Sequence, residues 1–394
     1  MQAREICPNI KAIISVHWER RLFDALIPLP DGTSYNAYLI QGSGKTALID
    51  SADPDLRCNL FAALEGVDSI DYLVSLHGEQ DHSGLLPDLL QRYPMATLLC
   101  SKKAEEILVS HLAIDKQRIQ TVEDAESISL GDLSLEFIYT PWVHWPETMC
   151  AYVPQRKCLF SCDLFGSHLA TADLFSDDKP RVYEAAKRYY AEIMMPFRTI
   201  LQKNLVKLAN YEIDVIAPSH GPCHREPSFI VDAYDSWVNG KLKNEVVIPY
   251  VSMHGSTAKM VHHLTQALVK EGVSVRVFDL TVTDIGQLAI ALVDAASIVV
   301  ASPTLLVGPH PMVGYAAALA NSLRPRLKYA GVMVSYAWGG KAIEQIAAAI
   351  SGLKLEVLGT ILQKGLPDQH CYAEIEKLAA AVAKAHREDD EVQC

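Results

Sequence analysis

A dense group of potential metal ligands lies in one short stretch of the chain. Within six residues, directly after an apolar run at residues 72–76, stand His77, Glu79, Asp81 and His82. The apolar run predicts a buried strand, and the polar residues predict the turn that leaves it. Imidazole nitrogens and carboxylate oxygens that converge on one point are the ligands of a dinuclear metal site. The stretch therefore predicts a two-metal centre.

Three more candidate ligands come from elsewhere in the same half of the chain: His144, Asp163 and His220. Each of them follows its own apolar run, which predicts a strand, and functional side chains gather on loops that a rigid sheet holds. Two other histidines of this half, His17 and His168, do not share the context and are expected to be structural.

Two iron-sized ions need roughly four to six ligands each, and one carboxylate can serve both. The seven residues divide into two sets: His77, Glu79 and His144 for one ion, and Asp81, His82 and His220 for the other. Asp163 is the predicted bridge because it alone arrives from a third strand between the two histidine sites.

The elements that must position these side chains form two different patterns. Up to residue 245 the chain predicts a hairpin across Gly42–Gly44, short helices, paired strands at 127–139 and a helical region at about 181–209. From residue 246 strands and helices alternate strictly, with five strands and crossover helices. We expect two domains, 1–245 and 246–394, the second a doubly wound parallel sheet.

The spacing of the ligand group resembles the metallo-β-lactamase superfamily, an αββα sandwich that usually carries histidine at the position of Glu79 and uses zinc for hydrolysis. A glutamate there, with the rest of the set present, resembles the flavodiiron proteins, or A-type flavoproteins. A carboxylate adds negative charge and a hard oxygen donor, which suits iron and a redox cycle. The resemblance covers nearly the whole chain, since that family continues into a flavodoxin-like domain, and it implies that all seven residues bind iron.

The second domain offers three loops at the carboxyl ends of its predicted strands, where such a sheet binds a mononucleotide. The first can cradle a phosphate at a helix N-terminus, and the last carries aromatic area for a flavin ring. No Gly-x-Gly-x-x-Gly fingerprint accompanies them, so a dinucleotide is not expected. The predicted FMN-binding residues are Ser252, Met253, His254, Gly255, Ser256, Thr257, Ser302, Pro303, Thr304, Leu305, Leu306, Ser335, Tyr336, Ala337, Trp338, Gly339 and Gly340.

The family resemblance implies reduction of dioxygen to water, of nitric oxide to nitrous oxide, or of both, with electrons passing through FMN to two irons. It also implies a head-to-tail homodimer or a dimer of dimers. Because no Cys-x-x-Cys pair occurs, no rubredoxin module is fused, and the donor is a separate rubredoxin-like protein or a reduced deazaflavin. The competing reading is a zinc-dependent hydrolase of the β-lactamase fold with a flavodoxin-like appendage.

Two positions around the irons leave the choice of gas open. Asp24 stands where many members of the family carry a histidine. A hydroxyl near the irons is expected from Tyr190, the predicted catalytic residue, or from its neighbour Tyr189. Groups just outside the ligand set can steer a metal site toward one substrate.

The composition of the chain argues against some classes of binding partner. The net charge of -12 argues against nucleic acid and anionic membranes as partners. Nine scattered cysteines, an odd number without framework spacing, favour reduced thiols in a cytoplasm. We expect neither a signal peptide nor a membrane span. The charged tail at residues 387–391 is expected to be solvated and disordered.

Overall fold

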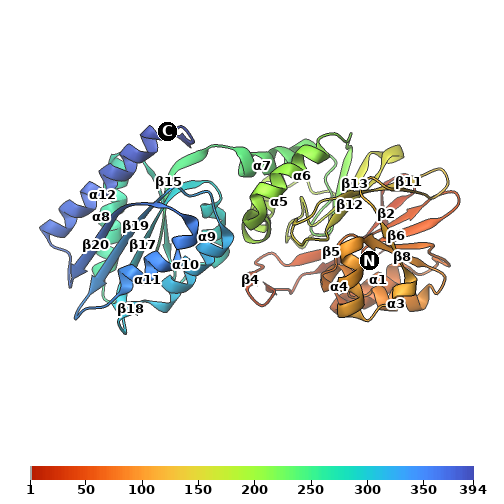
Figure 1. Ribbon diagram of the computed structural model, residues 1–394, viewed down its shortest axis with the longest axis horizontal. Coiled ribbons are helices and arrows are strands. Elements are labelled where there is room, and N and C mark those ends of the chain that lie inside the picture. Colours follow the sequence, from red (N-terminus) through yellow and green to blue (C-terminus); the bar gives the residue numbers. More distant parts are fainter. Residues whose placement is uncertain (1) are drawn as a thin grey trace. The chain divides into compact units, whose positions relative to one another are not determined.

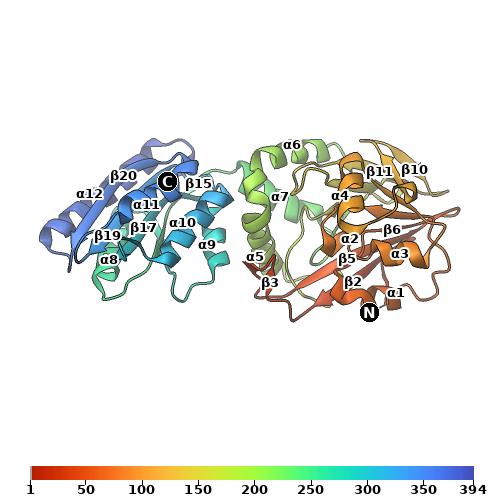
Figure 2. The same cartoon turned by 60° about the horizontal axis from the view of Figure 1, so that its bottom comes forward.

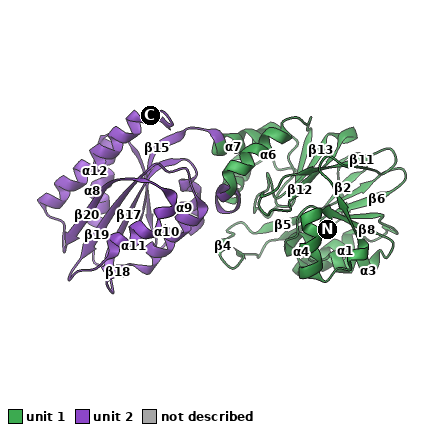
Figure 3. Cartoon of the chain, in the orientation of Figure 1, with its two compact units in different colours: residues 1–189, 197–238 green, residues 190–196, 239–394 purple. Residues whose placement is uncertain are grey.

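The computed structural model describes residues 2–394, which form two compact units (Figure 3). The first runs to Tyr189 and resumes at Phe197–Val238, and the second takes Tyr190–Pro196 and Asn239–Cys394. The chain passes from one unit to the other at the end of helix α7 (Pro227–Asn239), shortly before strand β15 (Leu242–Tyr250).

Two sheets make up the first unit (Figures 1 and 2). The larger sheet has the strand order β1 (Arg4–Cys7), β2 (Ile10–His17), β5 (Thr33–Gln41), β6 (Thr46–Ile49), β7 (Tyr72–Ser75), β8 (Thr97–Ser101) and β9 (Ile119–Val122). The smaller has the order β10 (Ser127–Ser129), β11 (Ser134–Tyr139), β12 (Met149–Val153), β13 (Cys158–Cys162) and β14 (Val215–Pro218). A short separate hairpin joins β3 (Leu22–Phe23) to β4 (Ile27–Pro28).

Helices cover the outer faces of these sheets (Figure 2). Those of the first half are η1 (Pro54–Leu56), α1 (Arg57–Ala63), α2 (Gln80–Ser83), α3 (Leu86–Arg92), α4 (Lys102–Leu112) and η2 (Lys116–Arg118). Those that follow are η3 (Pro154–Arg156), α5 (Lys179–Tyr189), the π-helical turn η4 (Tyr190–Met194), η5 (Met195–Phe197), α6 (Arg198–Leu208) and α7.

Separate apolar clusters hold the layers of the first unit together. One lies between the two sheets and includes Val74 of β7 and Phe160 of β13, both fully buried. Another packs Leu60 and Leu108, from α1 and α4, against the other face of the larger sheet. Because both faces of the central strands are covered, β5 is buried along almost its whole length. The expected αββα sandwich is confirmed.

The second unit is a parallel sheet in the order β16, β15, β17, β19, β20. These strands are β16 (Ser274–Asp279), β17 (Ala295–Leu305), β19 (Tyr329–Tyr336) and β20 (Glu356–Lys364), with β18 (Gly308–Pro309) paired to β17. The helices are α8 (Ser256–Lys270), α9 (Ile285–Leu292), α10 (Pro311–Leu323), α11 (Ala342–Ala349), η6 (Ser351–Leu353) and α12 (Gln369–Glu388). Clusters on both faces confirm the doubly wound, flavodoxin-like sheet.

The C-terminal tail is ordered, so the expectation of a disordered tail was wrong. Helix α12 continues to Glu388, and a last strand, β21 (Val392–Gln393), pairs with the start of β15. Val392 packs with Leu242 and Ala296 in a small apolar cluster. Burial of one apolar residue and pairing with a strand stabilise the tail in spite of its charges. The run of charged residues in the sequence indicates neither of these two contacts.

No helix among residues 2–394 is both long enough and apolar enough to cross a bilayer. All nine cysteines are free thiols.

Candidate metal centre and mononucleotide cradle

The structure brings all seven predicted ligands together at the ends of strands. His77, Glu79, Asp81 and His82 follow β7, and the last two lie in the single-turn helix α2. The loop after β11 carries His144, the turn after β13 carries Asp163, and the turn after β14 carries His220. Because these strands belong to both sheets of the sandwich, the cluster forms where the two sheets end together.

Asp163 lies in the middle of the cluster. Its Oδ2 is 3.6 Å from Nε2 of His77 and 3.7 Å from Nε2 of His144. Its Oδ1 is 3.2 Å from Nε2 of His82 and 3.3 Å from Nε2 of His220. Each carboxylate oxygen thus faces a different pair of imidazoles, which is the arrangement of a bridging ligand.

The remaining carboxylates extend these pairs into two sets. Glu79 Oε2 lies 3.1 Å from His77 Nε2 and 3.2 Å from His144 Nε2. Asp81 lies 3.3 Å from His82 and 3.5 Å from His220. We call His77, Glu79 and His144 the first position, and Asp81, His82 and His220 the second position.

Unpaired buried atoms test whether this set fits metal ions. Both carboxylate oxygens of Asp81 and Nε2 of His82 are buried without a hydrogen-bond partner. Buried polar atoms in native proteins are nearly always satisfied, and an ion satisfies such lone pairs directly. Donor atoms of His77, His144 and Asp163, and those of the second position, each lie within 4.8 Å of one another. The donor set is mixed nitrogen and oxygen, without thiolate, which suits iron.

In the cluster without metal, the histidines and carboxylates shift one another's pKa. Burial alone would lower the pKa of His77, but hydrogen bonds to Glu147 and Glu79 raise it well above its usual value. Burial opposes the charge of Asp163 too, yet the neighbouring His82 and His220 hold its pKa well below the usual range. Positive charge on the imidazoles thus balances buried carboxylates, a charge that bound cations would replace.

Two groups behind the ligands fix the orientation of ligand rings, and sequence reasoning missed both. Glu147 Oε1 accepts a hydrogen bond from His77 Nδ1 at 2.7 Å. The backbone carbonyl of Ser34 accepts from His220 Nδ1 at 2.8 Å. In each case the bond leaves Nε2 free to face the cluster. The only signal for Glu147 was an acidic residue three positions after His144, in a loop that also supplies a ligand.

Tyr189, rather than its neighbour, reaches the bridging residue. Its hydroxyl donates to Oδ1 of Asp163 at 2.8 Å. Tyr190 is also buried, but it opens the π-helical turn η4 and groups with the second unit. The catalytic role of Tyr190 stays a prediction, whereas the hydrogen bond to the cluster belongs to Tyr189.

His168 lies beside the cluster without belonging to either position. Its ring centroid is 4.8 Å from that of Tyr189 and 5.1 Å from that of His220. Nδ1 bonds to the Thr33 hydroxyl at 2.9 Å, while Nε2 is buried without a partner. Burial and the nearby His220 hold its pKa well below the usual value, so the ring is neutral.

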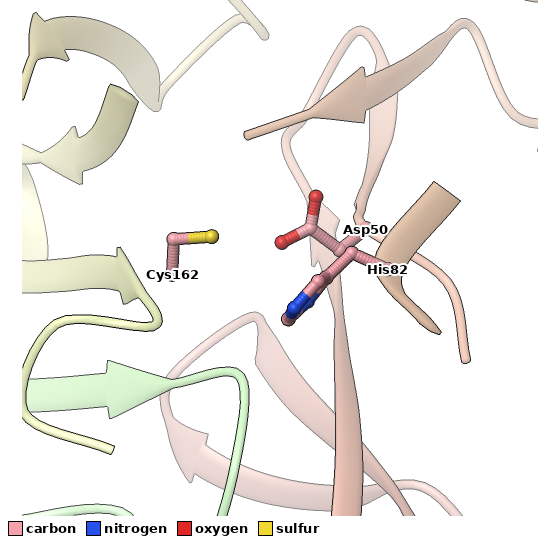
Figure 4. Close-up of side chains that lie close together, drawn as sticks. All are labelled: Asp50, His82 and Cys162. Atoms are coloured by element: carbon pink, nitrogen blue, oxygen red, sulfur yellow. The ribbon is translucent and has the colours of Figure 1, made fainter. Parts of the chain in front are cut away.

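A further group of donor atoms lies behind His82, where Asp50 and Cys162 face its ring from separate strands (Figure 4). Asp50 Oδ1 accepts from the Leu76 backbone at 2.8 Å, so its carboxylate already holds the strand end before His77. Burial raises the pKa of Asp50 to about 6. Burial also raises the pKa of the Cys162 thiol, which keeps it protonated and a poor ligand. Because the carboxylate of Asp50 is engaged by the Leu76 backbone and the Cys162 thiol is protonated, we do not assign another metal position to this group.

Asp24 lies at the tip of the β3–β4 hairpin, with a φ of 50°. Partial burial, together with the carboxylates of Glu79 and Asp81, raises its pKa. Asp24 is thus close enough to the metal cluster for the carboxylates of Glu79 and Asp81 to act on its charge, and its influence on the choice of gas stays a prediction.

The second unit has a cavity of about 400 Å³ at the carboxyl ends of its strands. Most of the predicted FMN residues line it, including Ser256, Thr257, Tyr336 and Trp338; Gly365 also lines it and was missed. Gly339 and Gly340 line an adjoining cavity of about 230 Å³. The lining lists for these two cavities do not contain Ser252, Gly255 or Ser302.

Those three residues shape the loops around the cavity. Gly255 caps α8 with a φ of 88° and leaves the helix N-terminus without a side-chain cap. Ser252 accepts from the Ala258 backbone at 3.1 Å, and Ser302 accepts from the His310 backbone at 2.9 Å. A helix N-terminus that begins at a glycine, with hydroxyls beside it, fits a phosphate, and the cavity volume is that of a cofactor site.

Comparisons with known proteins cover the whole chain. A family model described as ODP family beta lactamase matches residues 33–221. A protein named nitric oxide reductase, from Moorella thermoacetica, is 36% identical over 393 residues, 96% of this chain and 98% of the relative. The solved rubredoxin oxygen:oxidoreductase of Desulfovibrio gigas is 30% identical, with a TM-score of 0.94 and 98% of each chain covered.

The flavodiiron protein of Giardia intestinalis, also solved, is 27% identical, with a TM-score of 0.92, covering 98% of this chain and 96% of that one. These similarities extend through both units. They agree with the cluster of seven ligand residues in the first unit and with the parallel sheet of the second. The chain belongs to the flavodiiron proteins, a family of oxidoreductases in which a β-lactamase-like metal unit is followed by a flavodoxin-like unit.

Proposed function

We propose that this protein reduces dioxygen to water, nitric oxide to nitrous oxide, or both, at a non-haem diiron site, with electrons relayed through FMN from a separate donor. The single observation that carries the proposal is Glu79, whose carboxylate lies within 3.2 Å of two imidazoles of the first position. A hard anionic donor there favours iron over a zinc-bound hydroxide. The printed names of the relatives, an oxygen oxidoreductase and a nitric oxide reductase, point the same way.

When bound, the two irons and FMN supply the one- and two-electron chemistry that amino-acid side chains lack. The chain's own residues would hold the irons in the first and second positions, with Asp163 between them. Tyr189 donates a hydrogen bond to Asp163, and Ser34 fixes the ring of His220. His77, His82 and His220 are buried, so the protein keeps bulk water from most of the cluster.

FMN would lie in the cavity between the β15–α8, β17 and β19 loops. Backbone N–H groups at the start of α8 and the hydroxyls of Ser256 and Thr257 suit its phosphate. Tyr336 and Trp338 offer aromatic faces to the ring system. FMN is therefore proposed to be held by backbone and small side chains.

A homodimer, or a dimer of dimers, follows from the placement of the two sites in separate units. Apolar side chains are exposed around each site: Trp18, Leu22 and Leu26 near the β3–β4 hairpin, and Leu306 and Trp338 at the flavin loops. We propose that the flavin of one protomer serves the irons of its partner in a head-to-tail arrangement. Sedimentation of the holoprotein should give a dimer or tetramer, and a fully active monomer would contradict it.

The electron donor is proposed to be a separate rubredoxin-like protein or a reduced deazaflavin, because the chain carries no Cys-x-x-Cys pair. The printed name of the Desulfovibrio gigas relative pairs that protein with rubredoxin. We propose that the protein acts in the cytoplasm, where its nine thiols stay reduced.

Metal analysis combined with anaerobic stopped-flow tests the function. We expect about two irons and one FMN per chain, and rapid reoxidation of the reduced protein by dioxygen, nitric oxide or both. Zinc in place of iron, together with hydrolysis of a test ester, would support the zinc hydrolase and overturn the redox function. Flavin without any metal would also overturn it, and would leave a carrier of electrons.

A further inference from the structure

The imidazole of His77 is held by a buried carboxylate. Its Nδ1 lies 2.7 Å from Glu147 Oε1, and both side chains are completely buried. The Gly78 backbone N–H donates to the same oxygen at 3.0 Å. Because two donors converge on Oε1, that oxygen acts as an acceptor, and Nδ1 carries the hydrogen. Nε2 then faces Glu79 and Asp163, and its lone pair would bind a metal in the first position once its own proton is displaced.

Among residues 2–394, no carboxylate behind the two imidazoles of the second position is hydrogen-bonded to them. Asp50 lies within 4.8 Å of His82, but its Oδ1 accepts from the Leu76 backbone instead. The corresponding nitrogen of His220 donates to the neutral carbonyl of Ser34 at 2.8 Å. A carboxylate behind a ligating histidine raises the basicity of the ring, whereas a carbonyl orients the ring with a smaller effect. The two positions therefore differ in the donor strength of their imidazoles.

The hydrogen bond from Tyr189 adds to this difference. Its hydroxyl donates to Oδ1 of Asp163, the oxygen that faces His82 and His220 of the second position. A hydrogen bond to one carboxylate oxygen draws electron density away from it. Oδ2, which faces the first position, receives only the weaker contact of the Cys162 thiol, at 3.9 Å. The carbonyl behind His220 and the hydrogen bond from Tyr189 both weaken donation to the second position relative to the first.

The surroundings of Glu147 keep its charge effective. The indole of Trp145 packs edge-on against His77, with ring centroids 5.0 Å apart and an interplanar angle of 89°. A Cβ at Gly78 would come within 2.8 Å of Ile107, so the backbone and Ile107 close tightly over the carboxylate. Oε2 of Glu147 is buried without a partner. With water excluded, the charge acts on His77 through a low local dielectric.

We propose that Glu147 is a positioning residue that makes the first position the tighter of the two metal positions, filled first and emptied last. The inference rests on the proposed diiron function and deepens it by assigning an order to the two metals. It concerns binding of metal and not any step of the reaction.

The test is an anaerobic titration of the full-length, metal-stripped protein with Fe²⁺ in competition with a chelating indicator. The wild type should bind two Fe²⁺ ions with distinguishable affinities. Glu147→Gln keeps an oxygen acceptor for His77 but removes the charge, and it should weaken the tighter step by about 10- to 100-fold. The metal-free variant should still be folded at the temperature of the titration, as its unfolding curve measures, which separates tuning of the ligand from loss of structure.

Two backgrounds assign the affected position. In His220→Ala, which disables the second position, adding Glu147→Gln should weaken the remaining ion by the same factor. In His144→Ala, which disables the first, the added change should have no effect. Glu136→Gln is the matched control, because Glu136 is a partly buried acceptor, from Tyr211 at 2.7 Å, outside the metal cluster.

Each outcome bears on the proposal. Equal effects of Glu147→Gln in both backgrounds, or no effect in either, would overturn the assigned order while leaving the diiron function standing. A wild-type chain that binds no pair of ions would overturn both together. If Glu147→Gln does not fold, Glu147→Asp takes its place as the test variant. Aspartate keeps the negative charge next to His77, so this variant should bind the first Fe²⁺ as tightly as the wild type. A folded Glu147→Asp protein with weakened binding of that ion would overturn the proposal.

Discussion

The metal cluster and the flavin cradle of this chain are built from opposite materials. The cluster is made of charged side chains, with His77 completely buried between two sheets. The cradle is made of loop backbone, glycines and hydroxyls, and its Trp338 is 71% exposed. Ions need lone pairs in fixed directions, which only particular side chains provide, whereas a phosphate is bound well by backbone N–H groups.

This difference in construction predicts that substitutions affect the two sites differently. Removing one side chain from the cluster leaves buried charges without their partners, which is costly. Removing one side chain from the cradle leaves most backbone contacts in place. Changes at the cluster should therefore have large effects confined to the metals, and changes at the cradle should be smaller and confined to FMN.

The largest effect is expected from Glu79→Ala. Loss of this ligand should remove iron from the first position and lower gas-dependent reoxidation beyond the roughly 10- to 100-fold typical of groups behind a ligand. The yellow FMN spectrum should persist, because no flavin residue is altered. Iron and flavin contents, with stopped-flow, measure both. Retained turnover, or loss of FMN together with iron, would contradict the expectation that changes at the cluster are large and confined to the metals.

Acid should weaken the second unit at a point away from its cofactor. His386 is buried, with Nδ1 bonded to Asn244 and Nε2 to Ser297, and burial lowers its pKa to about 4 despite the nearby Asp389. The unfolded chain takes up this proton near pH 6.5, so the stability from neutral His386 is complete above that pH. It is lost as pH falls from about 6.5 toward 4, by about 2 to 3 kcal/mol in all.

Urea unfolding of the holoprotein at pH 7 and pH 5, followed by flavin fluorescence, measures this loss. In His386→Gln, which cannot titrate, the dependence on pH should flatten. The ring of Tyr329 lies 5.8 Å from that of His386, and burial raises the pKa of this tyrosine to about 12, so Tyr329 stays neutral over this range. The Cys394 thiol donates to the backbone carbonyl of His386. An unchanged slope in the variant would place the acid sensitivity elsewhere, for example at His224, whose pKa burial also lowers to about 4.

A moderate effect is expected from Trp338→Ala. An aromatic stack contributes about 0.5–1.5 kcal/mol beyond its buried area, so FMN should bind roughly 2- to 10-fold more weakly. Iron content should not change. Met95→Ala, which removes an 89% exposed apolar side chain from the first unit, is the control and should leave FMN affinity intact. Loss of metal in Trp338→Ala would show that the two sites are not independent.

The smallest effect separates two adjacent tyrosines. Tyr189→Phe removes the hydrogen bond to Asp163 and should slow gas reduction by a few-fold, since the net contribution of one hydrogen bond is about 0.5–1.5 kcal/mol and Asp163 keeps its imidazole partners. Tyr190→Phe leaves that bond in place. Turnover and iron content of both variants decide between them, and a larger loss in Tyr190→Phe would restore Tyr190 as the catalytic residue.

The sequence by itself determined the ligand types, their positions at strand ends and the alternation of the second unit. These are local properties, because a strand followed by polar residues is visible within about ten positions. The same reasoning explains why the predicted flavin loops fell on the cavity. Sequence could not show that the tail pairs with β15, since a charged run conceals one apolar anchor, Val392.

Only the tertiary structure decided which groups stand behind the ligands. Glu147 reaches His77 across 70 residues of sequence, and no local pattern encodes that approach. Tyr189 and Tyr190 cannot be told apart from the sequence, because they are adjacent residues of the same type. Adjacent residues on a helix point about 100° apart, and the π-helical turn starts between these two. Side-chain chemistry is thus carried by the sequence, whereas the direction and partners of each side chain depend on packing between distant elements.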